Sequence, residues 1–559
     1  MKRGEIVIAL LAALAVGFVV LVSAGDDGGG DRDSAKPAAG SVKVSFAYSP
    51  EKERLLKPLI ERFNRDGRKS AGKPVSVEGR SVASGEAESK IARGALRPVA
   101  WSPASSLWGR LLNFDADRPL APRESPSIVR TPLVIAMWEP FARALGWPRK
   151  RIGFEQVLRL AREKRGFAAF GRPQFGDFKL VHTNPDFSTS GLSAVVAEYY
   201  AATGRHEGLT ERQVTSSKAR GFVRDIERSI VHYGDTTLFI ADQMRQRGPG
   251  YASAVAMEEV TLLDFNRNRG GHPPLVALYP PEGTFYSDNP YITLDAPWVR
   301  PQQRAAAQVF QRWLSDQATP ERAGAEGFRP AGLKDKPAGR VTKANGADPA
   351  QPQRVLGLPE PRVLNSIKET WRRDRKPANV ELVLDVSGSM SQENRLERAK
   401  LGLEAFFREV SPEDRIGLTI FSDQIRQVVP IGPFSQNRDR MRALVRDLIA
   451  DGGTAVYDAT AKSLDTVRAL RDRERINAVV VLTDGEDTDS TLTAQDVINR
   501  ARAQGDSRDQ VRVFTIAYSA EAAGAREALT GIAKASGGQD YEGNTEDIET
   551  VYRSISSFF

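Results

Sequence analysis

Apolar positions along the first half of the chain switch between alternation and a helical repeat. Residues 42–47 alternate apolar and polar side chains, as a half-buried strand does, and 51–64 carries its apolar residues on one helical face. Continuous apolar runs at 132–137 and 275–279 indicate buried strands. This alternation of strands and helices predicts an α/β domain over 42–332, folded in two lobes.

The pattern is sharper in the last third of the chain. Residues 380–384 read as a strand, and 478–482 is a fully apolar run of the kind that a parallel sheet buries on both faces. Amphipathic helices are expected at 455–470 and 546–559. We therefore predict a second α/β domain over 378–559, a Rossmann-like doubly wound sheet.

Two stretches lack the pattern of a core. Residues 25–41 consist mainly of Gly, Asp, Ser, Pro and Ala, which is typical of a flexible tether. Residues 333–377 are interpreted as a linker, with a short helix near its end.

An apolar run at 6–24 follows Lys2 and Arg3 and precedes several aspartates. Basic residues before the run and acidic residues after it favour a cytoplasmic N-terminus and export of the rest of the chain. We predict that 1–24 is a single-pass anchor in the cell membrane; the alternative is a signal peptide cleaved after Ala24, which would secrete the protein. Both interpretations place the bulk of the chain outside the cytoplasm.

Composition excludes several classes of function. The net charge is only +8 over 559 residues, with basic and acidic residues interleaved, so no nucleic-acid partner is expected. The chain has no cysteine, which excludes disulfides, a cysteine nucleophile and thiolate metal sites. No glycine-rich phosphate loop with a lysine is present, and we expect no enzymatic activity.

Oxygen-bearing side chains follow the predicted strands of the last domain. Asp385, Ser387 and Ser389 stand at alternate positions after one strand, Thr454 follows a glycine, and Asp484 comes just after the apolar run. Each alone could be a turn or helix-cap residue. Together they are hard donors that suit a divalent cation, Mg²⁺ first and Mn²⁺ or Ca²⁺ as alternatives. Two carboxylates and three hydroxyls leave such an ion electrophilic, with a position that a partner's carboxylate can fill.

The set of motifs D-x-S-x-S at 385–389, G-T at 453–454 and T-D-G at 483–485 resembles the metal-ion-dependent adhesion site of von Willebrand factor type A domains. Order and spacing both match, and the resemblance covers roughly 378–559. It implies a domain that binds a protein partner through a metal ion and does not catalyse a reaction.

Signals in the first domain are softer. Ser49, Ser84, Ser102 and Ser188 lie in small polar loops beside predicted strands or helix starts. Hydroxyls and backbone N–H groups at such places can bind an anion, although ordinary caps and turns use the same residues. These four serines are our candidate ligand-binding residues.

Segments 131–136, 186–191, 279–284 and 288–291 make the first domain similar to extracellular solute-binding proteins of the bacterial type, related to those that capture small oxyanions. The resemblance spans 42–332. It implies a periplasmic-binding-protein-like fold whose two lobes close by a hinge on a small solute or oxyanion.

These interpretations combine into one hypothesis. The protein is a membrane-anchored extracytoplasmic recognition or adhesion protein that binds a protein partner through a divalent metal, with a module for a small ligand beside it. The alternative function is the solute-binding component of an ABC-type transport system.

Overall fold

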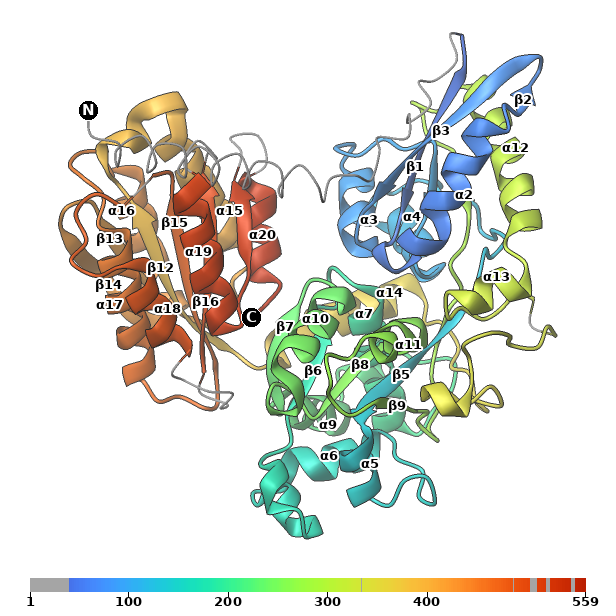
Figure 1. Cartoon of the computed structure of the whole chain (residues 1–559), viewed down its shortest axis with the longest axis horizontal. Coiled ribbons are helices and arrows are strands. Elements are labelled where there is room, and N and C mark those ends of the chain that lie inside the picture. Colours follow the sequence, from blue (N-terminus) through green and yellow to red (C-terminus); the bar gives the residue numbers. More distant parts are fainter. Residues whose placement is uncertain (1–39, 333, 486, 503–509, 519–522, 544–547) are drawn as a thin grey trace, which may run out of the picture.

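The predicted α/β class is confirmed in the computed structural model (Figure 1). The structure describes residues 40–332, 334–485, 487–502, 510–518, 523–543 and 548–559. The predicted anchor at 1–24, and the tether as far as residue 39, lie outside the described residues. Within the described ranges, no helix is both long and apolar enough to cross a membrane.

The first lobe is a sheet in the order β11-β4-β1-β3-β2. Its strands are β1 (Val42–Tyr48), β2 (Lys69–Ser70), β3 (Lys73–Ser81), β4 (Ala100–Ser102) and β11 (Ile292–Thr293). Its helices are α2 (Glu53–Arg65), α3 (Ser84–Ala92), α4 (Leu107–Asp115) and α12 (Pro301–Gln317). The predicted apolar face of α2 is buried, and β1 pairs in parallel with both β3 and β4. Because β11 and α12 come late in the sequence, the chain crosses to the second lobe and then returns to complete the first.

The second lobe is a sheet in the order β10-β5-β8-β6-β7, with β9 also paired to β5. Its strands are β5 (Thr131–Trp138), β6 (Leu180–Thr183), β7 (Ile230–Gly234), β8 (Ala254–Glu258), β9 (Leu275–Leu278) and β10 (Tyr286–Ser287). Its helices are α5 (Glu139–Ala144), α6 (Phe154–Arg162), α7 (Thr189–Thr203), α8 (Glu211–Val214), α9 (Ser217–Glu227), α10 (Thr237–Arg247) and α11 (Glu259–Arg267). Nearly every residue of α7 is buried, so this helix forms the centre of the lobe.

The segment between α12 and the C-terminal domain packs back onto the second lobe. Val355 bridges Thr284, and the guanidinium of Arg329 forms a buried ion pair with Glu259 at 2.7 Å. Helices α13 (Pro320–Ala325) and α14 (Pro361–Asp374) belong to this stretch. Trp371 of α14 is buried and lies edge-on to Tyr233, with ring centroids 5.2 Å apart.

The C-terminal domain is a sheet in the order β14-β13-β12-β15-β16-β17, parallel except for β14. Its strands are β12 (Ala378–Asp385), β13 (Arg415–Phe421), β14 (Ile425–Pro433), β15 (Ile476–Thr483), β16 (Val511–Tyr518) and β17 (Asp540–Gly543). Its helices are α15 (Arg395–Glu409), α16 (Phe434–Arg446), α17 (Val456–Ala469), α18 (Ala494–Arg502), α19 (Ala523–Ser536) and α20 (Ile548–Ser556). Every residue of β12 and β15 is buried, as a parallel sheet covered on both faces requires.

Two apolar clusters cover the two faces of this sheet. Leu382 and Leu384 pack in the cluster that contains Phe406 of α15, whereas Val383 packs in the cluster that contains Leu464 of α17. Alternate residues of one strand therefore serve opposite cores, which is the doubly wound arrangement that the sequence predicts.

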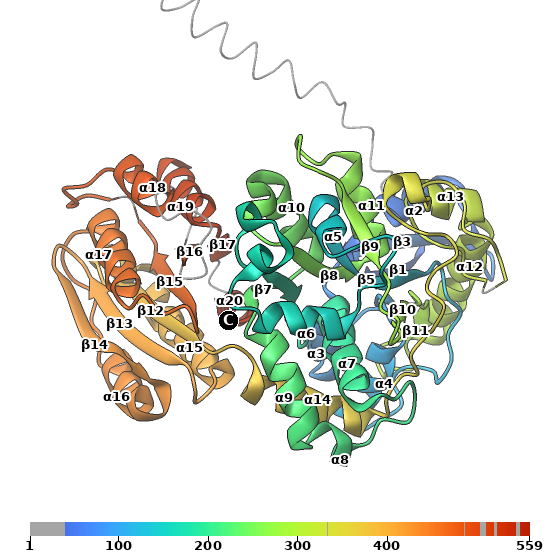
Figure 2. The same ribbon diagram turned by 90° about the horizontal axis from the view of Figure 1, so that it is seen from below.

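The C-terminal domain packs directly against the second lobe (Figure 2). The N–H of Tyr233 on edge strand β7 donates to the carbonyl of Phe558 at 3.2 Å, and the ammonium of Lys376 donates to the carbonyl of Ile230 at 3.0 Å. The ring of Phe558 lies edge-on to Phe239 at 5.2 Å. Backbone bonds and aromatic packing thus join the two domains at one strand edge.

Glu381 is a buried carboxyl in the middle of β12, held by Thr419 and Gln427. Burial raises the pKa of Glu381 from its ordinary value of 4.5 to about 7. Between these two pH values the folded protein therefore retains a proton that the unfolded chain has released. The contribution of Glu381 to stability should therefore fall as the pH rises from about 4.5 to about 7. Glu381→Gln should raise the free energy of unfolding of this domain more at pH 8 than at pH 5, by at most about 3 kcal/mol. Calorimetry with Glu397→Gln, an exposed matched control, checks this; equal shifts at both pH values would contradict it.

Candidate metal-binding site and interlobe cleft

The five predicted metal ligands lie on loops at one edge of the C-terminal sheet. Asp385 ends β12, Asp484 follows β15, and Thr454 lies just before α17. Because β12 and β15 are parallel neighbours, their ends meet at the same edge. Asp385, Ser387, Thr454 and Asp484 are buried, and Ser389 is partly exposed.

Direct contacts bring four of these five residues together. The hydroxyls of Ser387 and Ser389 lie 3.0 Å apart, and that of Ser389 donates to Oδ1 of Asp484 at 2.7 Å. The N–H of Ser387 donates to Oδ1 of Asp385 at 2.8 Å. Ser387, Ser389 and Asp484 therefore form a chain of hydrogen-bonded oxygen atoms, and Asp385 joins it through the backbone N–H of Ser387.

Asp385 is the most enclosed member of this group. Its Oδ2 accepts a hydrogen bond from the hydroxyl of Thr483 at 2.5 Å, across the two neighbouring strands. Burial raises the pKa of Asp385 to about 6. A carboxylate oxygen that accepts one hydrogen bond retains a lone pair for an ion or an ion-bound water.

Thr454 is joined to the site through the backbone of its loop. The N–H of Gly388 donates to the carbonyl of Gly452 at 2.9 Å, and the N–H of Thr454 donates to Oδ2 of Asp489 at 3.0 Å. The loop after β15 is thus hydrogen-bonded to the loop before α17. This holds Thr454 beside the loop that carries Ser387 and Ser389, which we call the serine loop.

Arg395, the first residue of α15, belongs to the site although it was not among the residues predicted from the sequence. Its guanidinium donates to Oδ2 of Asp484 at 2.8 Å, and both side chains are buried. The signal in the sequence is a lone basic residue shortly after the D-x-S-x-S loop. Arg395 neutralises one of the two carboxylates, which lowers the negative charge available to a cation.

The donor set fits a hard divalent cation. Carboxylate and hydroxyl oxygens are the ligands that Mg²⁺ and similar ions prefer, and these residues contribute no nitrogen or sulfur donor. With Asp484 already paired to Arg395, the ion would keep most of its positive charge for a further ligand.

Three of the four predicted ligand-binding serines meet between the lobes, and the fourth does not. Ser49, Ser84 and Ser188 line a cavity of about 20 Å³, which is room for about one water molecule. Ser102 is fully buried at the end of β4 and does not line that cavity, although its carbonyl accepts from the N–H of Ser49 at 3.1 Å; its hydroxyl has no hydrogen-bond partner among the described residues.

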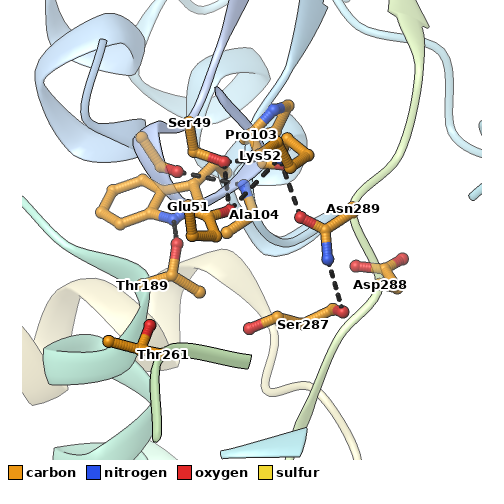
Figure 3. Close-up of polar contacts among 12 residues, drawn as sticks. Ser49, Glu51, Lys52, Pro103, Ala104, Thr189, Thr261, Ser287, Asp288 and Asn289 are labelled. Carbon is orange, nitrogen blue, oxygen red and sulfur yellow. Dashed lines mark hydrogen bonds and ion pairs between the residues drawn. The ribbon is translucent and has the colours of Figure 1, made fainter. Parts of the chain in front are cut away.

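Charged residues that no sequence pattern revealed lie on or beside this cavity, and Figure 3 shows two of them, Glu51 and Lys52, next to Ser49. The ammonium of Lys52 is completely buried and donates to Asn289 Oδ1 at 2.8 Å and to the carbonyl of Pro103 at 3.2 Å. Glu51 and Glu258 line the cavity itself, and burial raises the pKa of Glu258 to about 8. The carboxyl of Glu258 is therefore mostly protonated at neutral pH, and the ammonium of Lys52 also donates to the hydroxyl of Ser49 at 2.5 Å.

The two lobes are closed on each other. The N–H of Gly85 in the first lobe donates to the carbonyl of Phe187 in the second at 2.9 Å, and the indole of Trp108 donates to the hydroxyl of Thr189 at 2.7 Å. A Cβ atom on Gly85 would lie 2.3 Å from the carbonyl oxygen of Asp186. Only glycine permits this approach.

The segment that closes on Gly85 is also held by α14. Arg372 donates through two nitrogens to the carboxylate of Asp186, at 2.8 and 2.7 Å, and Lys368 pairs with it at 3.2 Å. The helix that leads into the C-terminal domain therefore contacts the edge of the cleft at which the lobes meet.

Two protein-family models match the chain. The model described as bacterial extracellular solute-binding protein matches residues 44–329, and the model of the von Willebrand factor type A domain matches residues 379–552. Both resemblances noted in the sequence are confirmed by these matches.

Two curated proteins of Mycobacterium tuberculosis, the uncharacterized proteins MT1884 and Rv1836c, are each 23% identical to the chain over 440 residues. The alignments cover 76% of this chain and 62% of those proteins, so the chain spans less than two thirds of their length.

Solved structures resemble each half of the chain. A von Willebrand factor type A protein from Catenulispora acidiphila is 20% identical, with a TM-score of 0.28, over 32% of this chain and 42% of its own. A periplasmic thiamin binding protein is 9% identical, with a TM-score of 0.42, over 60% of this chain and 97% of its own.

Gly85→Ala should hold the lobes apart, because its methyl group cannot occupy the space beside the carbonyl of Asp186. We expect a larger radius of gyration in solution scattering and a changed emission from Trp108, which loses its partner Thr189. Gly221→Ala is the matched control, since a Cβ there meets open space on α9. Identical scattering curves for the wild type and Gly85→Ala would contradict the closed arrangement.

Proposed function

Because the chain belongs to the bacterial extracellular solute-binding proteins and carries a von Willebrand factor type A domain, we propose that it recognises a protein partner through a divalent cation at the C-terminal site. Both modules are typical of extracytoplasmic binding proteins rather than enzymes. Residues 42–332 and 378–559 would then be two binding modules joined by 333–377. Residues 1–24 would serve as a membrane anchor, or as a signal peptide cleaved after Ala24.

The observation that carries this proposal is the cluster of hydrogen-bonded oxygens at the edge of the sheet. Ser389 contacts both Ser387 and Asp484, and Asp385 accepts from the N–H of Ser387. Von Willebrand factor type A domains commonly bind a divalent metal. When bound here, such an ion supplies an electrophilic position for an acidic side chain of the partner.

The residues of the chain have separate roles in this proposal. Ser387 and Ser389 present their hydroxyls to the ion, and Thr454 adds a third hydroxyl from its clasped loop. Asp385 holds the serine loop through the N–H of Ser387 and offers its remaining lone pair. Arg395 fixes the carboxylate of Asp484 and limits the charge that it donates. We assign no catalytic residue.

Removing a ligand should abolish metal binding without unfolding the domain. Asp385→Ala and Ser387→Ala should each weaken Mg²⁺ or Mn²⁺ binding by roughly a hundredfold or more in calorimetry, as loss of a coordinating or orienting group does. Ser391→Ala is the matched control, because Ser391 is exposed on the same turn and its hydroxyl donates to the carbonyl of Gly388. Equal affinity in Ser387→Ala and Ser391→Ala would refute the assigned site.

Arg395→Gln should strengthen Mg²⁺ binding, because removal of the guanidinium returns the full charge of Asp484 to the site. We expect an affinity gain of roughly fivefold at low ionic strength, shrinking as salt is added. Arg408→Gln, at the exposed far end of α15, should leave the affinity unchanged. Weaker binding in Arg395→Gln would instead mean that Arg395 mainly positions Asp484.

A second candidate function is solute binding for an ABC-type transporter. It is favoured by the meeting of Ser49, Ser84 and Ser188 at one cavity between two lobes. In that case the cleft must open well beyond its closed volume to admit a solute. Calorimetric titration with small neutral, cationic and anionic solutes tests this function. Asp385→Ala and Ser387→Ala should leave solute binding intact, because they change only the C-terminal site.

A further inference from the structure

Three buried titratable side chains meet inside the second lobe, outside both sites described above. They are His182 on β6, Glu198 on α7 and Glu227 at the end of α9. Each side chain is at most 1% exposed. One candidate ligand atom from each lies within 4.8 Å of the other two.

Neighbouring groups hold two of these side chains in the orientation that metal ligands take. Nδ1 of His182 lies 2.7 Å from the carbonyl of Thr183, which leaves Nε2 facing Oε1 of Glu227 at 3.0 Å. The hydroxyl of Tyr233 donates to Oε2 of Glu227 at 2.5 Å. Ligating histidines usually donate their other ring nitrogen to a carbonyl, and ligating carboxylates are themselves hydrogen-bonded.

Glu198 is the member that lacks a partner. Its Oε2 is completely buried and has no hydrogen-bond partner among the described residues. Burial raises the pKa of Glu198 well above its ordinary value, and the nearby carboxyl of Glu227 adds to the rise. A buried carboxyl oxygen without a partner is costly, so its place beside an imidazole and a second carboxyl indicates a group that binds a cation.

We propose that His182, Glu198 and Glu227 bind one divalent transition-metal ion, of which Zn²⁺ is the best match. Imidazole nitrogen and carboxylate oxygen are both ligand types that Zn²⁺ uses in proteins. Two donors on one tetrahedral ion lie about 3.3 Å apart, close to the 3.0 Å between His182 and Glu227. Two carboxylates and a neutral imidazole also balance the charge of the ion, which removes the cost of burying them unpaired.

The site would brace the lobe where the C-terminal domain docks. It connects β6, α7 and α9, and α14 packs against the two helices. The hydroxyl of Tyr233, which holds Glu227, also accepts from the N–H of Lys376 at 3.3 Å, at the entry to the C-terminal domain. Because the ligands are enclosed, the ion has a structural role, and its nitrogen donor separates it from the oxygen-only site at the sheet edge.

Metal analysis of the purified full chain tests this proposal. After dialysis against metal-free buffer, we expect about one transition-metal ion per chain in the wild type and less than about a tenth of that in Glu198→Gln. Glu88→Gln is the matched control, because Glu88 is another buried carboxyl with an unpartnered oxygen, in the first lobe. Asp385→Ala should also retain the ion, which separates this outcome from failure of the C-terminal site.

A spectroscopic measurement on the wild type covers the case in which Glu198→Gln does not fold. Co²⁺ refolded into the metal-free chain should give visible absorption that the metal-free chain lacks, and Zn²⁺ should raise the unfolding temperature by about 5 °C. Absence of any retained transition metal, of Co²⁺ absorption and of a Zn²⁺ shift would overturn the proposal. Equal metal content in the wild type and Glu198→Gln would overturn it as well.

Discussion

The parallel pairing of β12 and β15 is the constraint on which the C-terminal site depends. Their register sets Leu384 opposite Leu482, so both strands end together and an aspartate stands at or just after each end. The hydrogen bond from Thr483 to Asp385 closes this edge. Burial of both strands on two faces stabilises the register, and the polar loops therefore have little freedom to separate.

The relation between the domains depends on the second lobe in a similar way. The C-terminal domain packs on edge strand β7, and α14 reaches from that junction to Asp186 at the cleft. Cleft closure and the orientation of the C-terminal domain thus depend on the same lobe and the same helix. A partner bound at the C-terminal site and an occupant of the cleft would therefore both act on α14.

Much of this arrangement could be predicted from the sequence. Period-two and helical patterns placed the strands and the buried face of α2 correctly, and the strand ends identified the residues around Asp385. These features depend on local spacing, which a sequence displays directly. The closed lobes rest on a contact of Gly85 with the segment at Phe187, and no local pattern marks that pair.

Residues that act through distant partners could not be found in this way either. Arg395 meets a carboxylate that lies 89 positions later, and Lys52 meets Asn289 across 237 positions. In the sequence, a lysine or arginine that will be buried beside such a partner looks the same as one that stays in solvent. The two can be told apart only when the tertiary fold brings the partner's side chain to it.

Crystals grown with Mn²⁺ would show whether the edge of the C-terminal sheet holds a divalent cation. We predict an anomalous scattering peak about 2.2 Å from the hydroxyl oxygens of Ser387 and Ser389, with the carboxylate of Asp484 turned toward it. A structure at saturating Mn²⁺ with no peak there, and with Ser389 still donating to Asp484, would refute a cation site at this edge.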